Sequence, residues 1–410
     1  MRISSTQYFN MNVATMSDQQ AQLSQLYAEI SSGVSLSTPS DNPLGAAQAV
    51  QLSATATILS QYTSNQGAAL TSLQQEDSTL GSVTSALQSI HTLVLRAGDG
   101  SLNDGDRGSI ATQLQSLRSQ LMTLGNSTDS QGNYLFAGFQ STAQPYTTNS
   151  AGVVTYSGDT GTRAVQITDS HTVQTADNGI AIFSSVASIG TSAVPAATAG
   201  NSGTGVISGV SLTNPTNPAN AYTYSIAFAG AGAATTYTVT STDPATGAVT
   251  VGAPQAFTSG SAIALGGQSV TITGAPNAGD SFTVTPATQG STDVFANLSQ
   301  LITTLQTPVS GAAATASFQS AMVTSLTQLE NTMNNVVTAQ AAVGGREQEV
   351  QALQTVTQTN TLQTSNDLSN LTQTDMTKTI SKYTMTQASL QAAQQAFAKV
   401  QNMSLFQYLN

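Results

Sequence analysis

The fold is decided by residues 9–30, FNMNVATMSDQQAQLSQLYAEI, and by a matching stretch near the other end, residues 376–397, MTKTISKYTMTQASLQAAQQAF. Each stretch carries one large apolar residue at every seventh position. Such a repeat forms a narrow apolar seam along a helix, and another helix buries that seam. We therefore expect both ends of the chain to form helices that lie together. The seams are Phe9, Met16, Leu23 and Ile30, and Met376, Tyr383, Leu390 and Phe397.

The composition limits the classes of function. The chain has 410 residues, enough for two or three domains. Its net charge of −11 argues against nucleic acid and anionic membrane as partners, because both require clustered Lys and Arg. The absence of cysteine excludes disulfides and thiolate zinc sites. We expect neither a cleaved signal peptide nor a membrane span, because no apolar stretch has the required length.

Residues 1 to about 125 have a helical pattern. Gly33 can end the first helix, and Asn42 followed by Pro43 suits the N-cap and first turn of the next. From residue 44 to residue 97 nothing breaks the pattern, which indicates a coiled coil or an elongated bundle. The heptad positions of this helix are Leu52, Leu59, Leu73, Leu80, Leu87 and Val94, with Gln66 as the one polar member.

A turn at residues 98–106 then reverses the chain. Asn103 is the expected N-cap of the next helix, and such a short connection favours antiparallel packing against the long helix. The seam of this helix is Ile110, Leu114, Leu117, Leu121 and Leu124.

Residues 130 to 290 have a β pattern. Short strands are expected in the first half of this region, and half-buried antiparallel strands, which alternate polar and apolar residues, in the second. The Gly/Ala/Ser-rich residues 184–209 are interpreted as a linker or surface loop. The expected strands are residues 134–136, 153–156, 164–167 and 172–174, and then 222–226, 236–239, 269–272 and 281–284.

The helical pattern returns after residue 290, with a heptad at Met322, Leu329, Val336, Val343 and Val350. The predicted fold is mainly α with β: an elongated α-helical coiled-coil or bundle core formed by both chain ends, a β-hairpin region, and an inserted antiparallel all-β domain. The predicted domains are a terminal helical one (residues 1–43 and 366–410), a long-helix bundle (44–189 and 290–365, with hairpins at about 130–183) and the β insertion (190–289).

The sequence does not assemble a catalytic site, and no cofactor or metal is expected. His91 and His171 are far apart in sequence and lack a nearby acid or nucleophile pattern. Asp99, Asp104 and Asp106 lack the spacing and the terminal Glu of a calcium loop, and helix capping accounts for them better. The enzyme hypothesis therefore has no support from the residues present.

Several motifs resemble the bacterial flagellin superfamily. Ser32-Gly33 with residues 39–47, PSDNPLGAA, resembles its N-terminal signature, and residues 100–107, GSLNDGDR, resemble the turn between its core helices. Residues 132–138, GNYLFAG, are similar to its hook-associated protein 3 branch, the hook–filament junction proteins, and the opening MRIS fits that branch better than flagellin. The ending SLFQYL, residues 404–409, resembles the shared C-terminus. The signature residues are Gly33, Pro39, Asp41, Asn42, Pro43, Gly132, Tyr134, Phe136 and Gly138.

The resemblance covers roughly residues 1–183 and 290–410, and it implies a structural protein of the flagellum. Such proteins form a ring of copies between hook and filament, with another hook-associated protein on the hook side and flagellin on the filament side. They are exported by the flagellar type III system without signal cleavage, guarded by an export chaperone, and act outside the cell. One departure is that Val34-Ser35-Leu36 replaces the basic residue usual after Ser-Gly.

We expect the terminal helices to carry the contacts between subunits. Their seams stand among few other hydrophobic residues, and segments of this kind tend to fold on association. Two alternatives remain open: flagellin itself, and a secreted adhesin with a helical stalk and a β head. The expected interface residues are Phe9, Met16, Leu23, Ile30, Met376, Tyr383, Leu390, Phe397, Leu405, Phe406 and Leu409.

Overall fold

The computed structural model describes residues 5–36, 40, 42–150 and 152–406. Contacts between residues divide the chain into two compact units. The terminal unit consists of Met1–Ser64 and Leu353–Asn410, and the central unit is Asn65–Ala352. Each unit thus contains part of the two longest helices, α2 (Pro43–Ala97) and α6 (Ala312–Thr372). None of the described helices is long and apolar enough to cross a membrane.

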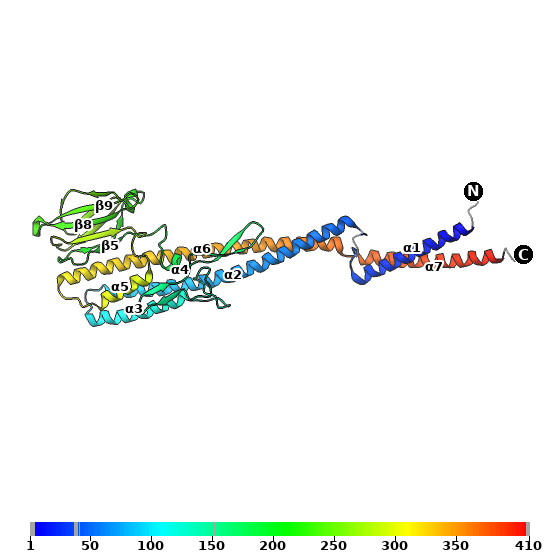
Figure 1. Ribbon diagram of the computed structural model, residues 1–410, viewed down its shortest axis with the longest axis horizontal. Helices are drawn as coiled ribbons and strands as arrows, with labels where there is room; N and C mark the ends of the chain where they lie inside the picture. Colours follow the sequence, from blue (N-terminus) through cyan, green and yellow to red (C-terminus); the bar gives the residue numbers. More distant parts are fainter. Residues whose placement is uncertain (1–4, 37–39, 41, 151, 407–410) are drawn as a thin grey trace. The chain divides into compact units, whose positions relative to one another are not determined.

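The terminal unit consists of helices. Both chain ends are helical, as the heptads predict: α1 (Ser5–Ser32) and α7 (Met376–Phe406). They run side by side, blue and red in Figure 1. α1 ends at Gly33, whose φ of +72° an L side chain rarely adopts, and its N–H donates to Glu29 O at 2.8 Å. The start of α2 and the end of α6 complete this unit.

The central unit is built on α2, α6 and α3 (Asp104–Gly125). Asn103 caps α3 as predicted, its Oδ1 accepting the N–H of Asp106 at 3.0 Å. The heptad residues of α2 from Leu73 to Val94 are at most 1% exposed, so this face of the helix is buried within the unit. The seam of α6 from Met322 to Val350 is likewise buried. The paired glycines in α6 do not interrupt the helix, which runs through 61 residues.

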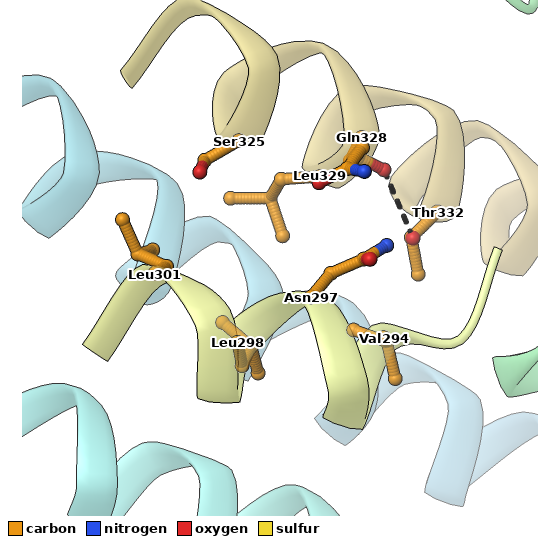
Figure 2. A pocket seen from close by; sticks show the side chains of 8 residues that line it. All are labelled: Val294, Asn297, Leu298, Leu301, Ser325, Gln328, Leu329 and Thr332. Atoms are coloured by element: carbon orange, nitrogen blue, oxygen red, sulfur yellow. Dashed lines mark hydrogen bonds between the residues drawn. The ribbon is translucent and has the colours of Figure 1, made fainter. Parts of the chain in front are cut away.

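Two shorter helices, α4 (Gly179–Phe183) and α5 (Val294–Gln306), complete the helical part, and the sequence patterns did not separate either of them. α5 packs on α3 and on α6. Figure 2 shows a small pocket between α5 and α6, which Leu298, Leu301 and Leu329 help to line. None of the eight residues that line this pocket titrates near neutral pH, so it supplies no acid or base.

Two β-hairpins follow α3. The first joins β1 (Tyr146–Thr148) to β2 (Val154–Tyr156), and the second joins β3 (Arg163–Gln166) to β4 (Thr172–Ala176). The prediction of a strand at residues 134–136 is wrong. Gly132 and Gly138 adopt φ of +84° and +68° and bend the chain on both sides, so that only Tyr134 forms an isolated bridge, to Thr128.

The inserted β domain is antiparallel and consists of two sheets. One sheet has the strand order β10-β9-β8-β14-β5, with β11 also paired to β9, and the other has the order β12-β13-β6, with β7 also paired to β13. The strands are β5 (Val194–Ala197), β6 (Val206–Ile207), β7 (Ser211–Leu212), β8 (Thr223–Ala229), β9 (Thr236–Thr242), β10 (Val249–Val251), β11 (Gln255–Ala256), β12 (Ala262–Leu265), β13 (Gln268–Thr273) and β14 (Ser281–Thr285), with 3-10 turns at Pro218–Ala221 and Gly232–Ala234.

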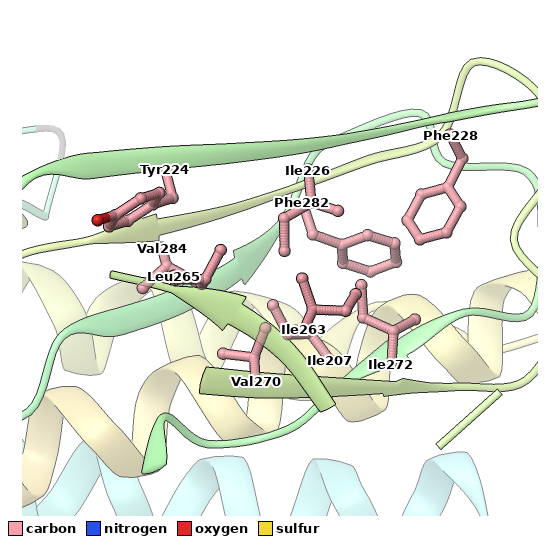
Figure 3. Close-up of a cluster of buried hydrophobic side chains, with 10 residues drawn as sticks. All are labelled: Ile207, Tyr224, Ile226, Phe228, Ile263, Leu265, Val270, Ile272, Phe282 and Val284. Atoms are coloured by element: carbon pink, nitrogen blue, oxygen red, sulfur yellow. The ribbon is translucent and has the colours of Figure 1, made fainter. Parts of the chain in front are cut away.

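The core of this domain lies between its two sheets. Ile226 and Phe282 from one sheet meet Ile263 and Ile272 from the other, and each is at most 2% exposed (Figure 3). These buried residues alternate with more exposed ones along their strands, which is the predicted pattern of a half-buried strand.

The interpretation of residues 184–209 as a linker or surface loop is wrong for the residues of β5 and β6. Val194 pairs with Thr285 of β14, and Ile207 is fully buried. Some small residues of this stretch serve close packing. A Cβ at Gly205, for example, would lie 3.0 Å from the ring of Phe282.

Candidate assembly interface

The terminal helices pair in antiparallel orientation. The ring of Phe9, near the start of α1, lies 5.1 Å from the ring of Phe397, near the end of α7. Toward the other ends, the rings of Tyr27 and Tyr383 are 6.5 Å apart. Aromatic pairs at these distances stabilise a contact beyond the area they bury. Three of these four residues belong to the predicted seams, and the seams therefore face one another within one chain.

Tyr27 was missed because it does not share the heptad position of Phe9 and Ile30. Its partner Tyr383 was predicted, and the only sequence signal for Tyr27 is its place three residues before Ile30. The side chain of Tyr27 remains 63% exposed despite this contact. Much of its ring is therefore free to contact something other than α7.

The pairing of α1 with α7 leaves the seams incompletely buried. Leu390 is 9% exposed, whereas Phe9 is 41% and Met376 is 43% exposed. The remaining seam residues are half-buried: Met16, Leu23, Ile30, Tyr383 and Phe397. In this pair of helices, each seam therefore keeps a side that α1 and α7 do not cover.

The two chain connections of the terminal unit are tied together. Val34, between α1 and α2, forms an antiparallel bridge with Gln373, between α6 and α7. Ser35 N–H donates to Thr372 O at 2.8 Å, and Thr374 N–H donates to Gly33 O at 3.0 Å. The connection between α1 and α2 therefore lies beside the connection between α6 and α7, and backbone hydrogen bonds join the two.

Exposed hydrophobic residues are concentrated in the terminal unit. Thirteen of the 21 exposed large hydrophobic residues in the described part of the chain belong to it, although it is the smaller unit. Leu390 is its one buried hydrophobic residue among those described. Apolar side chains exposed in this density are typical of surfaces that take part in interactions. The thirteen are Phe9, Met11, Val13, Tyr27, Val34, Leu44, Val50, Ile58, Val356, Leu362, Met376, Ile380 and Met385.

The buried heptad positions of α6 change from apolar residues to threonine where the helix passes into the terminal unit. In the central unit its buried positions are apolar and end with Val350, which is fully buried. The next two buried positions are Thr357 and Thr364. A threonine carries a hydroxyl in place of one methyl of valine, so it contributes less apolar area to the contact between helices. The helices of the terminal unit are therefore held by less hydrophobic burial than those of the central unit.

The signature residues have local structural roles where the structure describes them. Asn42 Oδ1 accepts the N–H of Gly45 at 3.0 Å and Pro43 begins α2, so both act as the sequence predicted. Tyr134 O accepts a hydrogen bond from Arg163, and Phe136 is fully buried with its ring 5.7 Å from that of Phe183. Gly33, Gly132 and Gly138 all have positive φ, and Pro39 and Asp41 lie outside the described residues.

The predicted apolar tail is described only in part. α7 extends through Leu405 to Phe406, whose side chains are not described, and Leu409 lies outside the described residues. The described residues contain no group of three or more His, Asp or Glu arranged to hold a metal ion. The described surface of the terminal unit is thus helical and carries exposed apolar side chains.

The chain is similar to flagellar proteins. Residues 3–141 match the bacterial flagellin N-terminal helical region. Flagellar hook-associated protein 3 of Salmonella typhimurium is 28% identical over 408 residues, which cover 99% of each chain. The crystal structure of flagellar hook-associated protein 3 from Legionella pneumophila superposes with a TM-score of 0.69 at 25% identity, covering 78% of this chain and 98% of that one. The crystal structure of FlgL from Xanthomonas campestris gives a TM-score of 0.66 at 25% identity, covering 76% and 97%.

Proposed function

The chain belongs to the family of flagellar hook-associated protein 3, and on this basis we propose that it is a structural subunit of the bacterial flagellum. In this role it forms, with copies of itself, the junction between hook and filament. The observation that carries the proposal is the terminal unit, which gathers most of the exposed hydrophobic residues of the described chain around half-buried seams. The terminal unit leaves these side chains exposed, and a neighbouring subunit can cover them.

The contacts of the assembled subunit follow from this role. We assign the subunit interface to the seams Phe9–Ile30 and Met376–Phe397 and to the apolar tail that ends at Leu409. The partners are further copies of the chain, a hook-associated protein on the hook side, and flagellin on the filament side. Head-to-tail contacts of this kind close into a ring or continue as a helical tube, depending on the rotation between copies.

The family also suggests a route to the site of assembly. We propose that the chain acts outside the cell, in the flagellum, and that the flagellar type III system exports it without signal cleavage and with the help of a chaperone. The domains proposed for these tasks are residues 1–43 with 366–410 for assembly, residues 44–189 with 290–365 as a supporting bundle, and residues 190–289 as an outer domain. The relatives are structural proteins, and the role proposed here requires no chemical step.

Deletion of the gene tests this function directly. Cells without the chain should keep their hooks, because the hook assembles first, but they should release flagellin into the medium, because the filament has no attachment point. Wild-type protein supplied from a plasmid should restore attached filaments. Intact filaments on the deletion strain would refute the junction role, and loss of flagellin from the medium together with the filaments would indicate that the chain is itself the filament subunit.

A matched pair of variants tests the interface within the same strain. Leu390→Asp places a charge in the seam of α7, where a carboxylate cannot be buried without a partner, and it should abolish filament attachment. Val249→Asp changes a residue that is 60% exposed on β10 of the inserted β domain, and it should leave attachment intact. Both proteins must be secreted at similar levels. Equal attachment by the two variants would contradict the assignment of the interface to the terminal helices.

A further inference from the structure

The hairpin β3–β4 is fastened to both long helices of the central unit. At its turn, Gln66 Nε2 of α2 donates to Ile167 O at 2.8 Å. On the other side, His171 Nε2 lies 2.7 Å from Glu349 Oε1 of α6. The side chain of Ile167 is fully buried beneath the turn. Asn65 Nδ2 of α2 also donates to Gln166 O at 2.7 Å, so the turn of the hairpin is held by polar contacts to both helices.

The other end of the hairpin is fastened through Asp177, which follows β4. Its backbone N–H donates to Glu76 Oε1 of α2 at 2.9 Å, and its Oδ2 lies 2.6 Å from Arg346 Nη2 of α6. Arg346 Nη1 also donates to Gln174 O at 3.3 Å. One carboxyl from α2 and one guanidinium from α6 thus meet at the end of β4.

Glu76 is buried among more acidic groups than basic ones. Its side chain is fully buried, and its Oε2 has no hydrogen-bond partner among the described residues. The charged groups that act on its carboxyl are Asp177, after β4, and Arg346, on α6. Asp77 and Glu347 adjoin Glu76 and Arg346 in sequence, and these two carboxyls interact with each other. The single guanidinium is already paired with Asp177. An ionised Glu76 would leave a buried negative charge without compensation, which is costly in an apolar environment.

We propose that Glu76 carries a proton in the folded protein and that this proton fastens the hairpin β3–β4 to α2 and α6. With the proton in place, the acid lies against Asp177 without repulsion and still accepts its backbone N–H. When the proton is lost, two carboxylates face one guanidinium in a buried site. The hairpin then opens at its Asp177 end, because opening exposes Glu76 to water.

The electrostatics of the site support this device. Burial, and to a lesser degree the neighbouring Asp177 carboxylate, raise the pKa of Glu76 to about 8. Because the pKa in the folded state is higher than in the open or unfolded state, protonation of Glu76 stabilises the closed hairpin at low pH. This stabilisation decreases as the pH rises above the ordinary pKa of a glutamate and is lost as the pH passes about 8.

Hydrogen exchange of the full chain, measured by mass spectrometry at pH 6 and pH 9, tests the proposal. Exchange of peptides covering residues 163–178 is corrected for its intrinsic pH dependence and compared with peptides of α3. The opening equilibrium of the hairpin should rise at least about tenfold between these pH values, while α3 should change little. An infrared band of a protonated carboxyl at pH 6 should disappear by pH 9.

Three variants separate Glu76 from its neighbours. Glu76→Gln retains the shape of the protonated acid, so its hairpin should stay equally protected at both pH values and the infrared band should be absent. Glu347→Gln, which removes a nearby carboxyl that does not hold the hairpin, should keep the pH response. His171→Gln should also keep the response above pH 7, since it removes only the contact of the turn with α6. A hairpin that remains protected in the wild type at pH 9, or an unchanged response in Glu76→Gln, would overturn the proposal.

Discussion

Gly179 shows how closely single residues are fitted in the central unit. It opens α4, and its N–H donates to Phe136 O at 2.9 Å. A Cβ at this position would meet the hydroxyl of Tyr146 and lie 2.7 Å from Tyr156 Cε2. Tyr146 is itself 1% exposed and cannot move aside. We expect Gly179→Ala to lower the free energy of unfolding by about 1–3 kcal/mol, as overpacking of a core does.

Thermal unfolding followed by circular dichroism measures this effect, and Gly344→Ala is the matched control. Gly344 lies inside α6, and a Cβ there would meet no atom within 4 Å. Since alanine favours the helix over glycine, this variant should be more stable by up to about 1 kcal/mol. A Gly179→Ala protein as stable as the wild type would show that the aromatic residues around this position can rearrange.

Residues that act on their own neighbours in sequence were predictable, and residues that act at a distance were not. Asn42 and Asn103 cap the helices that follow them, because a cap needs only the next few N–H groups. Glu76 and Asp177 are 101 positions apart, and nothing in either local sequence indicates that they meet. The heptads did predict that Phe9 and Phe397 each belong to a seam and that the two helices lie together, but not that these two residues pair.

At the level of elements, the terminal helices should be the first part of the free subunit to open. Most residues of their seams are only half-buried, and the part of α6 in the same unit buries Thr357 and Thr364 at its heptad positions. The central unit, by contrast, buries nearly all of its heptad residues. Segments with little apolar burial open with a small free energy. Limited proteolysis of the dilute monomer should therefore cut before about residue 45 and after about residue 365 first and leave a resistant middle.

Mass spectrometry of the early fragments tests this prediction. The exposed face of α2 within the central unit is the internal control, because it offers cleavage sites in a well-packed helix. Terminal helices that resist cleavage in the monomer would count against an interface completed by neighbours. They would instead favour the adhesin alternative, which needs a preformed helical stalk.

The elements that the sequence patterns predicted best are those whose heptad repeat continues over many turns. α2 and α6 were predictable because a heptad repeated over many turns is typical of a long packed helix and of no strand or loop. β5 was missed because its residues, Val-Pro-Ala-Ala, lie in a Gly/Ala/Ser-rich passage and pair with β14, far along the chain. α5 lies in the region predicted to be helical, but it was not distinguished from α6, although its buried Val294, Leu298, Leu301 and Leu305 have heptad spacing. Composition alone does not separate a flexible small residue from a tightly packed one.

For the whole molecule, the inserted β domain should be dispensable for attaching the filament. Its first strand, β5, is paired with its last strand, β14, so that Val194 and Thr285 are direct partners. The chain therefore enters and leaves the domain at one place, and the core between its sheets is made only of its own residues. Replacing residues 194–285 with a short Gly-Ser linker should leave the remaining helices folded, since both ends are already adjacent.

The shortened chain is best tested in the deletion strain, beside the full chain and the Leu390→Asp variant. It removes β5, whose Pro195 O accepts a hydrogen bond from Thr324 of α6 at 2.7 Å, so a modest loss of stability is expected, of about 1 kcal/mol for that hydrogen bond. Filament attachment should nevertheless persist, because the terminal unit is unchanged, whereas Leu390→Asp should abolish it. If the shortened chain is secreted and folded but releases flagellin, the inserted β domain takes part in the junction. The contacts between subunits would then extend beyond the terminal helices.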